Sequence, residues 1–167
     1  MRLGAQLKVL VAEKPISRDK ILALKPQFVA ALSESPNSPT AYEQTSNYML
    51  LIADYRSAIT YAERSLKLHD EQWEPNRTLT IAHMQLGEYA PAVFAGRRAE
   101  ELRNSLRSDP QFMYALAKSY AGAGNIHVAE MTLQLLRQET PNQHGTEEWH
   151  DAINFIAARV KSGNNKN

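Results

Sequence analysis

The fold of this chain is decided by residues 86–99, which read LGEYAPAVFAGRRA. The stretch is typical of the end of one amphipathic helix, a turn at Gly87, and the start of a second helix that returns along the first. Small residues at Ala92, Gly96 and Ala99 would let the two helix backbones approach closely. The stretch therefore predicts an antiparallel pair of α-helices.

The same pattern recurs on both sides of this stretch. Ala58 lies 34 residues before Ala92, and the flanking residues align in the same register. Ala129 lies 37 residues after Ala92, and that shift places Gly124 on Gly87. Apolar residues elsewhere recur at three- and four-residue spacings, and strand signals are nearly absent. The chain is predicted to be an array of helical repeats.

The repeats are degenerate, and each departure from the common repeat pattern leads to a structural prediction. Three residues are inserted between the second and third units, most simply by lengthening a helix through Arg107. Ala53 stands where the first of these units should have its turn glycine. Farther upstream, residues 5–38 form a weaker unit, in which Pro26 should either kink a helix or mark its true start.

On these motifs the chain resembles the tetratricopeptide repeat (TPR) proteins, whose unit is a helix–turn–helix of about 34 residues. The resemblance implies an all-α fold, a right-handed superhelix of antiparallel helix pairs (a TPR-like α-solenoid) with a C-terminal capping helix. Thr146 is the expected N-cap of that helix. We expect a single domain, 1–162, with a frayed tail, 163–167. Its expected parts are the weak unit 5–38, the repeats 39–72, 73–109 and 110–143, and the cap 146–162.

Composition excludes several classes of function. The formal net charge is +1, which predicts no general affinity for nucleic acid or anionic membrane. Cysteine is absent, so disulfides and thiolate chemistry are excluded. No segment approaches the roughly 20 apolar residues of a membrane span, and Lys8 interrupts the apolar run at the N-terminus. A cytoplasmic protein is expected, with a periplasmic one open if the chain is cut from a longer exported protein.

The sequence contains only weak signs of a metal-binding or catalytic site. The densest histidine region is residues 144–150, where Glu147 and His150 could offer two metal ligands on one helical face, but the start of a helix with acidic residues explains it better. No nucleophile–base pair, glycine-rich phosphate loop or paired-carboxylate motif is recognisable. We therefore expect no enzyme activity, no cofactor, no metal and no small-molecule substrate.

The resemblance implies a different kind of site, a concave groove lined by the first helices of successive repeats that receives a peptide. Trp73, Arg77 and Ile81 follow helical spacing and form one stripe with Met84. An aromatic, an arginine and a methionine are typical of an interface anchor. An equally good interpretation is that Trp73 and Ile81 pack on a neighbouring helix. The expected lining is Glu43, Asn47, Leu50, Trp73, Arg77, Ile81, Met84, Gln85, Tyr114 and Lys118.

One activity of the family can be compared directly. Chaperone-binding members hold a terminal carboxylate with lysine, asparagine and arginine side chains from three first helices. The corresponding positions here are Glu43, Asn47, Thr78, Gln111 and Ala115, and only the asparagine matches. Without the cations the charge-assisted hydrogen bonds are lost, so binding of acidic chaperone tails is disfavoured.

The sequence thus predicts a non-catalytic scaffold or adaptor that binds a protein segment in its concave groove. Two other interpretations stay open. The first is a chaperone of the secretion type, which has a similar size and repeat number. The second is a nucleic-acid-associated regulator that uses the arginine-rich run 97–107, although the near-zero net charge disfavours it. The oligomeric state and the identity of the partner are not predicted.

Overall fold

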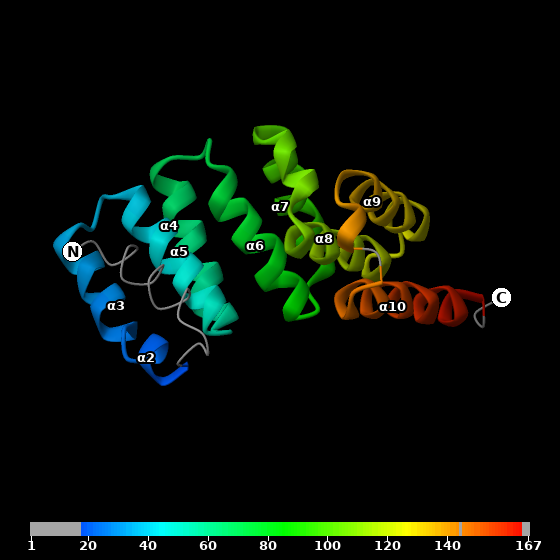
Figure 1. Ribbon diagram of the computed structural model, residues 1–167. Coiled ribbons are helices and arrows are strands. Elements are labelled where there is room, and N and C mark those ends of the chain that lie inside the picture. Colours follow the sequence, from blue (N-terminus) through cyan, green and yellow to red (C-terminus); the bar gives the residue numbers. More distant parts are fainter. Residues whose placement is uncertain (1–17, 144, 165–167) are drawn as a thin grey trace. The chain divides into compact units, whose positions relative to one another are not determined.

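Helices joined by short turns make up the described chain (Figure 1). The computed structural model describes residues 18–143 and 145–164, and these residues contain no β-strand. They belong to two compact units, Met1–Asp70 and Glu71–Asn167, each of which is described by itself. Residues 5–17 of the predicted weak unit and the last three residues of the predicted tail lie outside the described residues.

The first unit contains two short helices followed by one antiparallel pair. Its helices are α2 (Arg18–Leu22), α3 (Lys25–Glu34), α4 (Pro39–Leu51) and α5 (Tyr55–Leu68). Pro26 lies in the first turn of α3, so it marks a helix start, because a missing N–H in the first turn costs no helical hydrogen bond. Ser38 caps α4 by accepting a hydrogen bond from the Ala41 amide at 3.2 Å.

The core of this unit is centred on Tyr48. Its ring stacks on that of Phe28, with ring centroids 4.3 Å apart and an interplanar angle of 10°. The Tyr48 hydroxyl donates to the Ile21 carbonyl oxygen at 2.8 Å, so one side chain of α4 fixes both α2 and α3. Ala58 and Ala62 are fully buried on α5, as expected for small residues at a close helix–helix contact.

The turn between α4 and α5 carries a strained residue. Ala53 has φ of +61°, in the left-handed region where a β-carbon costs roughly 1–2 kcal/mol. The next residue, Asp54, caps α5 by accepting from the Ser57 amide at 3.3 Å. Lys25 donates a hydrogen bond to the other Asp54 oxygen at 2.7 Å, and that bond lowers the pKa of the Asp54 carboxyl.

Substitution of Ala53 by Gly is expected to stabilise the first unit by about 0.5–1 kcal/mol, because relief of the left-handed strain exceeds the extra entropy of an unfolded glycine. The reciprocal change, Gly124→Ala, should destabilise the second unit by about 1 kcal/mol. Gly124 has φ of +89°, and an added β-carbon would meet nothing within 4 Å, so only backbone strain is measured. Urea unfolding followed by far-UV circular dichroism would check both. A loss of stability in Ala53→Gly would contradict the strain argument.

The second unit contains two antiparallel pairs and a final helix. Its helices are α6 (Trp73–Gln85), α7 (Tyr89–Leu102), the 3₁₀ helix η1 (Asn104–Ser108), α8 (Pro110–Gly122), α9 (Ile126–Glu139), the 3₁₀ helix η2 (Pro141–Gln143) and α10 (Glu147–Asn164). Helix α6 pairs with α7, α8 pairs with α9, and α10 packs on α8 (Figure 1). Thr146 accepts from the Trp149 amide at 3.2 Å, which confirms the predicted cap of the final helix.

The residues that predicted the hairpins behave as expected. Gly87 and Gly124 have φ of +74° and +89°, so both turns use the left-handed conformation. Ala92, Ala99 and Ala129 are fully buried where second helices pack. These small residues are therefore buried where the helices pack, as predicted.

The prediction that a helix continues through Arg107 is wrong. Helix α7 ends at Leu102, and the extra residues form η1 instead. At the end of α7 the backbone of Arg103 is extended, with φ of −152°, and its guanidinium carbon lies 4.0 Å from the Trp73 ring centroid. Leu106 then turns into the core, where it is buried. A cation–π contact and burial of a leucine therefore favour leaving the helix over extending it.

Candidate functional site

Three helices of the second unit turn one face each toward a common pocket with a volume of about 560 Å³. Helix α6 contributes Ile81 and, about one turn later on the same helical face, Met84 and Gln85. Helix α8 contributes residues at positions 111, 114, 115 and 118, which again share one face. The third wall comes from η2 and α10. We call this cavity the α6–α8–α10 pocket.

The lining of the pocket combines apolar and polar residues. Ile81 and Ala115 are buried, and Met84 lies half-exposed beside them. Three glutamines, Gln85, Gln111 and Gln143, also line the pocket. A primary amide both donates and accepts hydrogen bonds, as does the backbone of a peptide. The pocket can therefore bury an apolar side chain while its rim bonds to a neighbouring backbone.

Tyr114 joins two walls of the pocket. Its ring is almost fully buried, and its hydroxyl lies 3.4 Å from the Gln143 carbonyl oxygen and 3.3 Å from the Thr146 hydroxyl. Thr146 is also the N-cap of α10. The residue that Tyr114 contacts is therefore the one at which the α10 wall of the pocket begins. The geometry of the pocket thus depends on the cap of the final helix.

Two ion pairs hold charged side chains at the rim. Arg77 donates from Nε to the Asp109 carboxylate at 2.6 Å and from Nη2 to the Gln111 amide oxygen at 3.0 Å. Lys118 donates to the Asp151 carboxylate at 2.7 Å. Both cations are mostly covered, with side-chain exposures of 20% and 19%, and both tie one helix to the next. Arg77 and Lys118 therefore already have carboxylate partners.

The structure brings together five of the predicted groove residues: Ile81, Met84, Gln85, Tyr114 and Lys118. Arg77 lies next to them through its bonds to Asp109 and Gln111. Trp73 does not line the pocket, because its ring is covered by Arg103 and packs on the core of the unit. The remaining three, Glu43, Asn47 and Leu50, lie half-buried on α4 in the first unit.

Sequence reasoning missed the wall that α10 supplies. Glu148 lies 37 residues after Gln111, and Asp151 lies 37 residues after Tyr114. This is the same shift that superposes the second and third repeats. If the same 37-residue shift is applied once more, from the third repeat into the capping helix, it places both carboxylates beside the pocket. The family resemblance implies only a covering role for the capping helix.

The structure adds little support for the two other candidate sites, the histidine region 144–150 and the arginine-rich run 97–107. Within residues 18–143 and 145–164, no group of three or more histidine, cysteine, aspartate or glutamate side chains is placed to hold a metal, and His144 lies outside these residues. In the arginine-rich run, Arg98 contacts Glu101 at 3.3 Å, while Arg103 is stacked on Trp73. Burial also raises the pKa of the Glu100 carboxyl in the middle of that run. Two of the four arginines in this run are therefore engaged with neighbouring side chains.

Comparison with known proteins identifies the fold. No family model matches the chain, and neither does any curated protein. Among solved structures, YrrB, a TPR protein with an unusual peptide-binding site, is 15% identical and superposes with a TM-score of 0.62 over 84% of this chain and 78% of that one. MamA is also 15% identical, with a TM-score of 0.69 over 99% of this chain and 97% of its own. TTC0263, a thermophilic TPR protein of Thermus thermophilus, is 19% identical, with a TM-score of 0.63 over 96% and 79%.

The chain therefore has the fold of the TPR proteins, an all-α solenoid of antiparallel helix pairs. At these identities the likeness extends to the fold alone. No helix in the described part of the chain is both long and apolar enough to cross a membrane.

Proposed function

We propose that this chain is a non-catalytic protein-interaction scaffold that binds a peptide segment in the α6–α8–α10 pocket. The observation that carries the proposal is the convergence of three helix faces on one pocket, whose lining includes the buried Ile81 and Ala115 and three glutamines. A buried aliphatic side chain of the peptide would rest on Ile81 and Met84, and its backbone would bond to the amides. Micromolar affinity, about −8 kcal/mol, is typical of such a transient contact.

The fold supports this proposal by analogy. YrrB, which shares the fold, is described as having a peptide-binding site, and solenoids in general present extended surfaces to other chains. The ion pairs of the two cations near the pocket argue against ligands that bind through a terminal carboxylate. Arg77 and Lys118 are already bonded to carboxylates, so a peptide that needs a free cation for its terminal carboxylate finds none in them. The favoured ligand is an internal segment with an apolar residue between polar ones.

The test is a selection of random 12-residue peptides displayed on phage against the immobilised full chain, with affinities then measured by fluorescence polarisation. Met84→Glu places a charge on the apolar floor and should weaken the selected peptides at least tenfold. Gln85→Ala removes one rim amide and should weaken them about threefold, which corresponds to roughly 0.6 kcal/mol.

Met131→Glu is the matched control, because the same substitution falls on α9, outside the pocket, at a side chain that is 55% exposed. Its affinities should equal those of the wild type. Circular dichroism of each variant checks that the helices are retained. Equal affinity of the selected peptides for Met84→Glu and for wild type would rule out this pocket as the binding site.

A further inference from the structure

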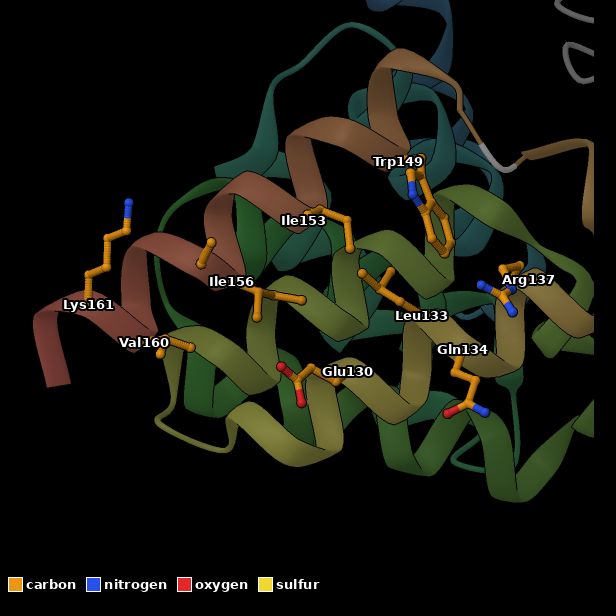
Figure 2. Close-up of a pocket in the computed structure, with 10 residues that line it drawn as sticks. Glu130, Leu133, Gln134, Arg137, Trp149, Ile153, Ile156, Val160 and Lys161 are labelled. Atoms are coloured by element: carbon orange, nitrogen blue, oxygen red, sulfur yellow. The ribbon is translucent and has the colours of Figure 1, made fainter. Parts of the chain in front are cut away.

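Helix α10 carries two of the residues that line the α6–α8–α10 pocket, so its separation from α8 sets the width of that pocket. On the side of α9, the packing of α10 is open. A groove of about 550 Å³ lies between α9 and α10, lined on α10 by Ile153, Ile156 and Val160 (Figure 2). Ile156 is buried, but Ile153 is 42% exposed and Val160 is 38% exposed. Contacts on another face of α10 therefore contribute to holding this helix in place.

That other face is a stripe of residues turned toward α8 and α7. Asp151, Phe155 and Arg159 follow one another at four-residue spacing, so they lie on one side of α10. Asp151 lines the pocket, where it accepts a hydrogen bond from Lys118 at 2.7 Å. The Lys118 ammonium also lies 5.3 Å from the centroid of the Phe155 ring. The stripe thus continues from the pocket wall to contacts outside the pocket.

Outside the pocket the stripe meets Tyr89, the first residue of α7. The rings of Tyr89 and Phe155 are tilted by 59° with their centroids 5.9 Å apart, a favourable geometry for two aromatic rings. The guanidinium carbon of Arg159 lies 5.3 Å from the Tyr89 ring centroid and 5.1 Å from that of Phe155. Arg159 also donates a hydrogen bond to the Tyr89 hydroxyl at 3.3 Å. One side chain of α7 therefore contacts two successive turns of α10.

The same ring lies against α8 at Gly122, the last residue of that helix. Gly122 follows the pocket residue Lys118 by four positions, so both lie on one face of α8. A β-carbon added at Gly122 would overlap the Tyr89 ring, at 2.5 Å from its Cδ1 atom. The ring therefore packs directly on the backbone of α8, and its other contacts are with α10. It occupies the space between two walls of the pocket, one helical turn beyond the pocket itself.

From these contacts we propose that Tyr89 is a positioning residue for the α6–α8–α10 pocket: its ring is a wedge that sets the separation of α8 and α10. The proposal rests on the proposed function, because it assigns Tyr89 to the same peptide-binding site. Tyr89 does not line the pocket. It acts through Phe155 and Arg159, which hold the stripe of α10 that carries Asp151.

The first experiment measures the position of α10 without any peptide. The chain has no cysteine, so cysteines introduced at the exposed residues Gln138 on α9 and Ala158 on α10 accept spin labels at those two positions only. Helix α9 packs on α8 and serves as the reference. In double electron–electron resonance, Tyr89→Ala should broaden the distribution of label distances about twofold, because α10 loses contacts on that side. Tyr89→Phe keeps the ring, so it should preserve the wild-type distribution.

A double-mutant cycle separates a wedge from a general loosening of the fold. Gly122→Ala displaces the Tyr89 ring without removing it, so it should broaden the distribution as Tyr89→Ala does. In the Tyr89→Ala background the added methyl group meets no ring, so Gly122→Ala should have no further effect. Two substitutions that loosened the fold independently would instead have additive effects.

The second experiment measures peptide affinity by fluorescence polarisation, with the peptides selected against the wild-type chain. Both Tyr89→Ala and Gly122→Ala should weaken these peptides about fivefold, which corresponds to roughly 1 kcal/mol. Tyr89→Phe should bind them as the wild type does. Tyr55→Ala is the matched control, because Tyr55 lies 34 residues before Tyr89, at the corresponding position of the preceding repeat, and begins α5 in the first unit. It should change neither the label distances nor the affinities.

Three results would overturn the proposal. They are an unchanged distance distribution in Tyr89→Ala, additive effects of the Tyr89 and Gly122 substitutions, and a changed distribution with unchanged peptide affinity. In the last case α10 would move without any consequence for the site. Because the distances are measured without peptide, the first two results are independent of equal binding by Met84→Glu, which would instead overturn the proposed function.

Discussion

Substitution of Ala92 by Leu is expected to destabilise the second unit by about 1–3 kcal/mol. Ala92 is fully buried where α7 packs in the second unit, and three added carbons have no space to enter. Alanine and leucine have nearly equal helix propensity, so the loss measures overpacking and not the stability of the isolated helix. The same argument applies with more force at Gly96, whose added β-carbon would lie 2.5 Å from Cδ1 of Leu116.

Tryptophan fluorescence is the appropriate measurement, because both tryptophans of the chain, Trp73 and Trp149, belong to the second unit. The urea midpoint of Ala92→Leu should fall by roughly 0.5–1.5 M. Ala90→Leu is the matched control, since Ala90 is exposed on the same helix. Its midpoint should stay within the error of the wild type. Equal losses in the two variants would show that the buried face of α7 has been assigned incorrectly.

Substitution of Tyr48 by Ala should cost the first unit about 3–5 kcal/mol, because a fully buried aromatic ring is removed from its core. The stack on Phe28 and the hydrogen bond to Ile21 are lost together. Both contacts hold α2 and α3 against α4, so hydrogen exchange of amides in α3 should accelerate by about two to three orders of magnitude. The amide of Ser35, which donates to the Ala31 carbonyl oxygen, is a convenient reporter.

Tyr48→Phe separates the two contacts. It keeps the stacked ring and removes only the hydroxyl, so the expected loss is about 0.5–1.5 kcal/mol. Tryptophan fluorescence should not change in either variant, because the first unit contains no tryptophan. If Tyr48→Phe lost as much stability as Tyr48→Ala, the hydrogen bond to α2, and not the ring, would organise this unit.

Part of the candidate site could be predicted from the sequence because it depends on spacing within single helices. Ile81, Met84 and Gln85 share a face of α6 whatever packs on it, so they reach the same pocket. Trp73 lies on the same predicted stripe but is withdrawn from solvent by Arg103, which comes from the connection after α7. That contact requires the chain to leave the helix at residue 103. No local rule indicates this exit, because the run 97–107 also has good helix formers.

Spacing, small residues and turn glycines by themselves determined that this chain is an array of antiparallel helix pairs. These signals are local: a glycine permits the left-handed turn, and an alanine permits close backbones, wherever the helices finally lie. Only the tertiary structure decided that η1 replaces a longer helix, that α10 closes the pocket with Glu148 and Asp151, and that the same helix leaves a groove beside α9. Each of these results depends on which surfaces of distant segments pack together. The free energy of burying apolar surface between such segments cannot be predicted from the sequence of one helix alone.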